Sequence, residues 1–153
     1  MANIQASQIQ GDNNWALLLD PDGNIAEGTG DNFFIVKNGK IITPGGGNFL
    51  KGISRDYVMQ DLSRDLKIEV IEKNIEEYDV YTADEAFMTG TPFCMLPVTS
   101  LNGNKIGDGK VGKIFDILIK QWGNNVGVDI AGQIKKWSNT YQTNNQPTPY
   151  RFK

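Results

Sequence analysis

The first third of the chain alternates short apolar runs with turn residues, a pattern typical of β-hairpins. Strands are predicted at residues 15–19, which read as a buried run, and at 25–27, 33–37 and 40–43. The intervening Asp20-Pro21-Asp22-Gly23-Asn24 and Asn38-Gly39 have the composition of tight turns. Residues 1–14 are polar, rich in Gln and Asn, and carry no strong period. We therefore expect two successive hairpins, ended by a flexible loop at 44–47.

Further along, apolar residues recur at helical spacing. One predicted helical face holds Ile53, Tyr57, Val58, Leu62 and Leu66, and a second holds Val111, Ile114, Phe115, Leu118, Ile119 and Trp122. Strands are expected at 68–72, 85–88 and 94–101, with a short helix or loop at 76–83 and turns at 89–92 and Asn102-Gly103. A shorter helix is expected around Ile130, Ile134 and Trp137, followed by a polar tail at 138–153.

Hairpins followed by strands between helices indicate one α/β domain with a mixed or barrel-like sheet, rather than a doubly wound parallel one. The chain has 153 residues, 39% of them apolar, which is enough for a single core. There is no internal repeat and no second composition regime. We therefore predict one domain over residues 1–137.

Composition excludes several kinds of chemistry. The chain has no histidine and a single cysteine, Cys94, so it holds no Ser-His-Asp triad, His-ligated zinc site, internal disulfide or Cys-ligated cluster, and no metal is expected. Its net charge of −3 with scattered basic residues argues against a nucleic-acid surface. No apolar run is long enough to span a bilayer and no signal segment is evident, so we expect a cytoplasmic protein without membrane contact. An enzyme of this composition would take its reactivity from a cofactor.

Four polar segments are candidate sites. Gly107 to Lys113 fits part of a phosphate loop, but Ile114 replaces the Ser or Thr that would bind magnesium, so a glycine-rich approach to a helix is the better interpretation. Gly52-Ile53-Ser54 opens a predicted helix, whose free amides could bind a phosphate; alternatively, Ser54 only caps that helix. Thr89-Gly90-Thr91 is either a ligand-binding turn or an ordinary one. Glu27 is either a solvated strand end or the partner of a cationic ring nitrogen.

The order of these segments resembles a known family. Ala26-Glu27-Gly28-Thr29-Gly30-Asp31-Asn32-Phe33-Phe34, Leu50-Lys51-Gly52-Ile53-Ser54-Arg55 and Ala83-Asp84-Glu85-Ala86-Phe87-Met88-Thr89-Gly90-Thr91 are similar to the C-terminal domain of class IV (fold type IV) aminotransferases. This family includes branched-chain and D-amino-acid transaminases and uses pyridoxal 5′-phosphate. The likeness covers roughly residues 15 to 122 and implies the pseudo-barrel α/β domain of the D-amino-acid aminotransferase-like fold.

The resemblance also implies residue roles. Glu27 would pair with the pyridine nitrogen of the cofactor, and Leu50 would lie against the ring. The amides of Ile53 and Ser54, with the hydroxyls of Ser54 and Thr91, would hold the 5′-phosphate. Gly30, Thr91 and Pro92 would border the substrate, although Pro92 lacks the amide donor that branched-chain members have there. Phe93 beside it is expected to reshape the pocket.

The Schiff-base lysine of this family lies upstream of the glutamate that matches Glu27, whereas no lysine precedes Lys37 here. We therefore expect the C-terminal portion of a longer homodimeric enzyme, inactive alone, with apolar surface left to self-associate. The implied reaction is amino-group transfer between an amino acid and a 2-keto acid, with the branched-chain type as the leading interpretation. Two alternatives stay open: a lyase of the aminodeoxychorismate type with the same fold, and a non-catalytic, stand-alone binding domain.

Overall fold

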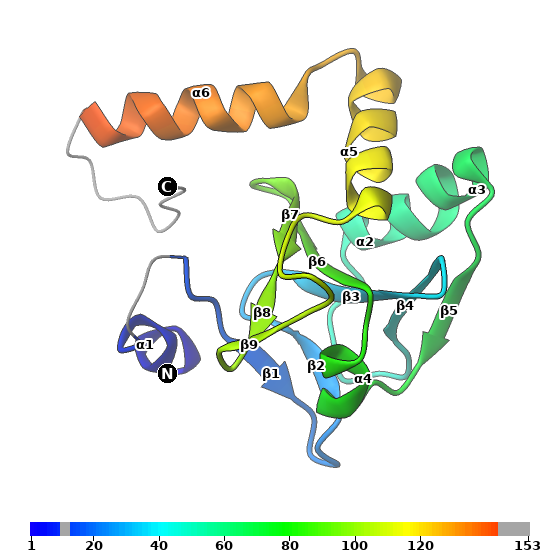
Figure 1. Ribbon diagram of the computed structural model, residues 1–153, viewed down its shortest axis with the longest axis vertical. Helices are drawn as coiled ribbons and strands as arrows, with labels where there is room; N and C mark the ends of the chain where they lie inside the picture. Colours follow the sequence, from blue (N-terminus) through cyan, green and yellow to red (C-terminus); the bar gives the residue numbers. More distant parts are fainter. Residues whose placement is uncertain (10–12, 144–153) are drawn as a thin grey trace.

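The computed structural model describes the backbone of residues 1–9 and 13–143, and side chains as far as Lys136 (Figure 1). Its centre is a five-stranded sheet in the order β5-β4-β3-β6-β7. The strands are β3 (Asn32–Lys37), β4 (Lys40–Pro44), β5 (Val70–Lys73), β6 (Glu85–Gly90) and β7 (Cys94–Val98). β4 and β5 are parallel and the other neighbours are antiparallel, so the sheet is mixed, as predicted.

Two smaller hairpins flank this sheet. β1 (Leu17–Leu19) pairs with β2 (Ile25–Gly28), and β8 (Ser100–Leu101) pairs with β9 (Asn104–Lys105). The expected turns at Asp20 to Asn24, Asn38-Gly39 and Asn102-Gly103 join strands, with Asn38 and Gly39 both at positive φ. The first strand is not buried, however: it is half-covered, and Leu19 is 50% exposed. In a two-stranded hairpin at the edge of the fold, only one face of each strand packs against the protein, which explains why this strand is less buried than predicted.

Side chains that alternate along the central strands fill two core layers. Phe34, Val36 and Phe87 point to one face, where they pack with Leu62 and Leu118 of the helices. On the other face, Phe33, Ile35 and Met88 pack with residues of β2, α4 (Glu77–Tyr81) and the segment that follows β9. Figure 1 shows this division, with α2, α3 and α5 together on one side and β1, β2 and α4 on the other.

The first long helix is continuous from Ile53 to Leu66 but not regular. It consists of α2 (Ile53–Tyr57), a π-helical turn η1 (Val58–Leu62) and α3 (Ser63–Leu66). Val58 and Leu62 are fully buried, as predicted, whereas Ile53 is 86% exposed. Five residues advance a helix by about 140° beyond a full turn, so Ile53 lies well away from the direction of Val58. Assigning Ile53 to the buried face was therefore wrong, and its side chain is left free at the surface.

At the carboxyl end, α5 (Lys113–Val126) buries Phe115, Leu118 and Trp122 as predicted. Placing Val111 on the same face was wrong, because Val111 precedes the helix and is 48% exposed. α6 (Ile130–Thr143) is longer than expected and continues through residues 138–143, where a tail was predicted. The remainder of that predicted tail, 144–153, lies outside the described residues, and the domain bounds stay a prediction. In the part of the chain that the structure describes, no helix has the length and apolar character needed to cross a membrane.

The amino-terminal segment forms a short helix, α1 (Ala2–Ser7), which the sequence pattern did not indicate. The carbonyl of Met1 accepts hydrogen bonds from the amides of Ile4 and Gln5, and only Ala6 is buried. Local hydrogen bonds and one from the Thr29 hydroxyl to Asn3 Oδ1 at 2.7 Å, rather than an apolar face, hold this helix, so it leaves no period in the sequence.

Candidate functional site

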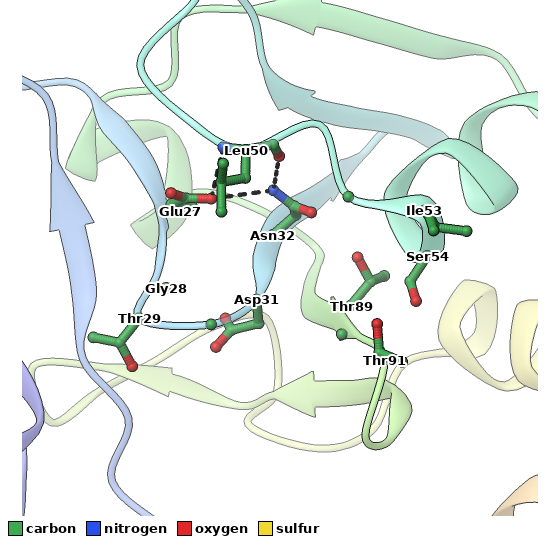
Figure 2. A pocket seen from close by; sticks show the side chains of 13 residues that line it. Glu27, Gly28, Thr29, Asp31, Asn32, Leu50, Ile53, Ser54, Thr89 and Thr91 are labelled. Atoms are coloured by element: carbon green, nitrogen blue, oxygen red, sulfur yellow. Dashed lines mark hydrogen bonds between the residues drawn. The ribbon is translucent and has the colours of Figure 1, made fainter.

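A pocket opens where the β2–β3 connection, the turn before α2 and the end of β6 meet (Figure 2). It has a volume of about 150 Å³. Six of the seven predicted site residues line it: Glu27, Gly30, Leu50, Ile53, Ser54 and Thr91. These residues come from positions far apart in the sequence, and Glu27 and Ser54 share one cavity. The seventh, Pro92, is not among the lining residues and is exposed in the turn after Thr91.

One end of the pocket is acidic. Glu27, near the end of β2, is half-buried, and its Oε2 accepts hydrogen bonds from the Leu50 amide at 3.0 Å and from Asn32 Nδ2 at 3.4 Å. Within the described residues, Oε1 has no hydrogen-bond donor of its own. The carboxylate is therefore oriented by the protein and keeps one free acceptor, which is not the arrangement of a plain solvated strand end.

The other end presents hydrogen-bond donors. α2 begins after Gly52, whose carbonyl accepts the first helical hydrogen bond, from the Asp56 amide at 3.0 Å. The amides of Ile53 and Ser54 precede that bond and have no acceptor within the helix. No side chain caps this helix, so the alternative in which Ser54 is only a cap is wrong. Figure 2 shows the side chains of Ser54 and Thr91 on the same side of the pocket, away from Glu27.

Two buried polar residues of the pocket, Asp31 and Asn32, were not candidates in the sequence analysis, and a third, Thr89, was considered only as part of the Thr89-Gly90-Thr91 turn. All three are buried, at 5%, 6% and 1% exposed. The carboxylate oxygens of Asp31 and the hydroxyl of Thr89 have no hydrogen-bond partner in the part of the chain that the structure describes. Asn32 and Thr89 face each other across β3 and β6, so strand pairing brings them together. A polar residue at the start of an otherwise apolar strand was the available signal for Asn32.

Burial raises the pKa of Asp31 to about 6, from an ordinary value of 3.8. The nearby amide of Gly30 lowers this pKa in part, whereas the negative charge of Glu27 raises it further. The two carboxyl groups therefore differ in their surroundings: Glu27 accepts hydrogen bonds from Leu50 and Asn32, whereas burial is the largest influence on the pKa of Asp31.

Two glycines make room for these side chains. A Cβ on Gly28 would overlap the carboxylate of Asp31, and a Cβ on Gly52 would overlap Oδ1 of Asn32. Neither glycine has a positive φ, so close approach of the neighbour, rather than backbone conformation, requires glycine here.

The predicted effect of Phe93 on the pocket stays a prediction, because its ring lies behind the lining residue Gly90 rather than in the pocket itself. Phe93 is 2% exposed and does not line the pocket. Its ring packs edge-on against Trp15, with centroids 5.6 Å apart. The turn is also shorter than expected, because Thr89 and Gly90 belong to β6 and continue the ladder with β7. The preference of an aromatic ring for the core accounts for the direction that Phe93 takes.

The second glycine-rich segment is not an anion site. It leads into α5, where the carboxylate of Glu85 accepts hydrogen bonds from the amides of Ile114 at 2.9 Å and Phe115 at 3.0 Å. Gly112 lies against this carboxylate, and a Cβ there would overlap it. The protein itself thus supplies the anion at this helix, which agrees with interpreting Gly107 to Lys113 as structural.

Comparison with known proteins agrees with this geometry. The model of the family described as "Amino-transferase class IV" matches residues 1–101. The branched-chain-amino-acid aminotransferase of Pseudomonas aeruginosa is 40% identical over 114 residues, which are 74% of this chain and 37% of that protein. This chain spans about two fifths of the length of such curated relatives.

Solved structures give the same result. A branched-chain amino acid aminotransferase from T.th., solved with pyridoxamine 5′-phosphate, matches with a TM-score of 0.72 and 38% identity, over 76% of this chain and 38% of that one. The PLP-form of the enzyme from Thermobaculum terrenum matches with a TM-score of 0.74 and 32% identity, over 85% of this chain and 42% of that one. The α/β fold with a mixed sheet is therefore the one expected from the resemblance, and the chain belongs to the class IV aminotransferase family.

Proposed function

We propose that this chain is the cofactor-binding C-terminal part of a pyridoxal 5′-phosphate-dependent transaminase of branched-chain type. The whole enzyme would move an amino group between an amino acid and a 2-keto acid. The main support is that Glu27 and Ser54 line one pocket, with a carboxylate at one end and free amides at the other. The names of the relatives favour a branched-chain substrate.

The residues of the pocket fit the proposed cofactor. Pyridoxal 5′-phosphate carries a basic ring nitrogen and, beyond the ring, a phosphate. Glu27 Oε1 offers an acceptor to a protonated nitrogen, while the amides that open α2 and two hydroxyls offer donors to an anion. A single ligand with a cation at one end and an anion at the other satisfies both ends of the pocket.

Each residue then has a definite task. Glu27 holds a proton on the ring nitrogen, and the charge pair keeps both groups ionised. Leu50, whose side chain is 77% exposed, packs against the ring. Ile53 and Ser54 donate amides to the phosphate, to which Ser54 and Thr91 add hydroxyls. Gly30 and Thr91, which line the pocket, border the substrate, whereas Pro92 follows Thr91 without lining the pocket. When bound, the cofactor acts as the electron sink that weakens the bond from the α-carbon to its hydrogen.

No lysine lines the described pocket, so the lysine that carries the cofactor in this family would come from outside this chain. We therefore assign transamination to a longer protein and cofactor recognition to this chain. The chain alone should be inactive but should retain the noncovalent contacts to the ring and the phosphate.

Cofactor recognition can be tested by calorimetric titration of the whole chain with pyridoxamine 5′-phosphate, which has no aldehyde to react with surface lysines. We expect pyridoxamine, which lacks the phosphate, to bind at least about ten-fold more weakly. Glu27→Gln and Ser54→Ala should each lower the affinity for pyridoxamine 5′-phosphate by about ten-fold, because each removes a charged or charge-assisted hydrogen bond.

Ser100→Ala is the matched control, since Ser100 is exposed on β8 and does not line the pocket. Its affinity for pyridoxamine 5′-phosphate should equal that of the unchanged chain. Equal binding of the two ligands, or no binding of either, would contradict the proposed function.

We also propose that the enzyme is a cytoplasmic homodimer and that this chain self-associates through exposed apolar surface. Leu50 and Ile53 stand together at the pocket rim at 77% and 86% exposed. Light scattering over a concentration series should show an average mass that rises above 17.0 kDa, and Ile53→Asp should reduce that rise. A mass that stays monomeric at every concentration would contradict this prediction.

A further inference from the structure

We propose that Asn32 is a positioning residue that links the acidic end of the pocket to the turn leading into α2. This inference rests on the proposed function and deepens it, because it explains how two distant parts of the sequence are kept at the right places for one ligand. Asn32 itself would not touch the ring nitrogen or the phosphate. It would act through Leu50 and Glu27.

The link runs through the backbone of Leu50. Asn32 Nδ2 donates to the Leu50 carbonyl at 2.7 Å, and the same carbonyl accepts from the Gly52 amide at 2.9 Å. On its other side, the Leu50 amide donates to Glu27 Oε2 at 3.0 Å. Asn32 Nδ2 also reaches Glu27 Oε2 directly, at 3.4 Å. One side chain therefore contacts both the carboxylate and the turn, as the dashed lines in Figure 2 show.

The side chains of Leu50 and Lys51 do not fix this part of the turn by packing. Leu50 is 77% exposed and Lys51 is also exposed, so neither anchors the turn in the core. Asn32, by contrast, is 6% exposed and stands on β3, in register with Thr89 of β6. A rigid strand thus holds an exposed turn through a buried amide, which is how a loop carrying ligand contacts is kept at a fixed geometry.

The start of α2 is held on the sheet by Arg55, independently of Asn32. Arg55 is 3% exposed, and its guanidinium donates to the Pro44 carbonyl at 3.1 Å and to Glu72 Oε2 at 2.7 Å. Its Cζ also lies 4.7 Å from the centre of the Phe49 ring. Removing Asn32 should therefore leave α2 docked on the sheet while releasing the orientation of the Leu50 peptide and of Glu27.

Gly52 provides a second way to break the same link. A Cβ on Gly52 would overlap Oδ1 of Asn32, whereas it would meet Arg55 Cβ at an ordinary contact distance of 4.0 Å. The backbone of Gly52 is extended, with φ of −71° and ψ of 143°, which alanine adopts without strain. Gly52→Ala should therefore displace the Asn32 amide without removing any polar group.

The test is calorimetric titration of the whole chain with pyridoxamine 5′-phosphate. Asn32→Ala is expected to weaken binding by about ten-fold, and Gly52→Ala to weaken it in the same direction. The double variant should bind no more weakly than Asn32→Ala, because the overlap no longer exists. In a Glu27→Gln background, Asn32→Ala should weaken binding by about three-fold or less, since the carboxylate that Asn32 positions is already absent.

Asn125→Ala is the control, because Asn125 Nδ2 also makes two side-chain hydrogen bonds, to Tyr57 and Asp65, and none of these three residues lines the pocket. It should leave the affinity unchanged, and thermal unfolding of every variant verifies that it folds. An Asn32→Ala affinity within two-fold of the unchanged chain, or an equal loss in the Glu27→Gln background, would overturn this inference. Failure of the unchanged chain to bind the ligand would instead contradict the proposed function.

Discussion

Replacing Asp31 with Asn is expected to remove a pH dependence of about 3 kcal/mol from the free energy of unfolding. The pKa of Asp31 is about 6 in the folded chain, against an ordinary value of 3.8. Because the folded state holds this proton more tightly, the group stabilises the fold below pH 4. That contribution is lost as the pH rises through 6, where a buried carboxylate without hydrogen-bond partners becomes charged.

Urea denaturation between pH 4 and pH 8 measures this effect as the difference between Asp31→Asn and the unchanged chain. The difference should grow in favour of the variant as the pH rises to about 6.5, and then level off. Burial alone would raise the pKa of Asp79, but the Glu76 amide and Lys73 outweigh burial and lower it; this opposite contribution is the same in both proteins and cancels. The control is Asp22→Asn, at an exposed position. Its free energy of unfolding should change with pH in the same way as that of the unchanged chain. Parallel curves for Asp31→Asn would show that its carboxylate is solvated.

Replacing Glu85 with Ala is expected to lower the free energy of unfolding by about 2–3 kcal/mol. Its carboxylate is half-buried and accepts the amides of Ile114 and Phe115, at the positive end of the α5 dipole. Without it, these amides lose a charged acceptor beside the core, and the space over Gly112 is left empty.

Denaturant midpoints at pH 7 check this prediction, with the slope confirming that the unfolding transition is unchanged. Asp116→Ala is the matched control, because Asp116 is also an acid in the first turn of α5 but is exposed, and it should cost less than about 1 kcal/mol. Glu85→Gln should fall between the two, since it keeps one acceptor oxygen and loses the charge. A Glu85→Ala midpoint equal to that of Asp116→Ala would mean that solvent replaces the carboxylate.

The elements that were predictable are those with a local cause. Asn38-Gly39 supplies the positive φ values of a tight hairpin, and the stripe of Phe115, Leu118 and Trp122 reflects one buried face. The order of the strands had no such cause, because the parallel pairing of β4 with β5 depends on packing of the intervening helix. The prediction for that helix was also partly wrong, since the π turn and the exposed Ile53 follow from tertiary contacts rather than from the period of apolar residues.

The residues of the candidate site likewise divide into those that the sequence could identify and those that it could not. Glu27, Ser54 and Thr91 could be identified because the chemistry they suit is visible in the residue types and because their motifs resemble a family. Asp31 could not, and Thr89 was only a member of a possible ligand-binding turn, since the unusual property of both is burial without a partner, and burial depends on which strands become neighbours. Asn32 was overlooked for a related reason: its importance lies in its contact with residue 50, which is eighteen positions away.

The glycines at 28, 52 and 112 each adjoin a polar side chain, respectively Asp31, three residues along the chain, and the more distant Asn32 and Glu85. The space for the larger residue therefore exists only while its neighbour has no side chain. We therefore expect each glycine and its neighbouring polar residue to change together in evolution. A related sequence with alanine at one of the three positions should also have a shorter or differently oriented side chain at the neighbouring position. Conversely, lineages that keep the acid or amide should tolerate nothing larger than a hydrogen opposite it, however ordinary the backbone angles are there.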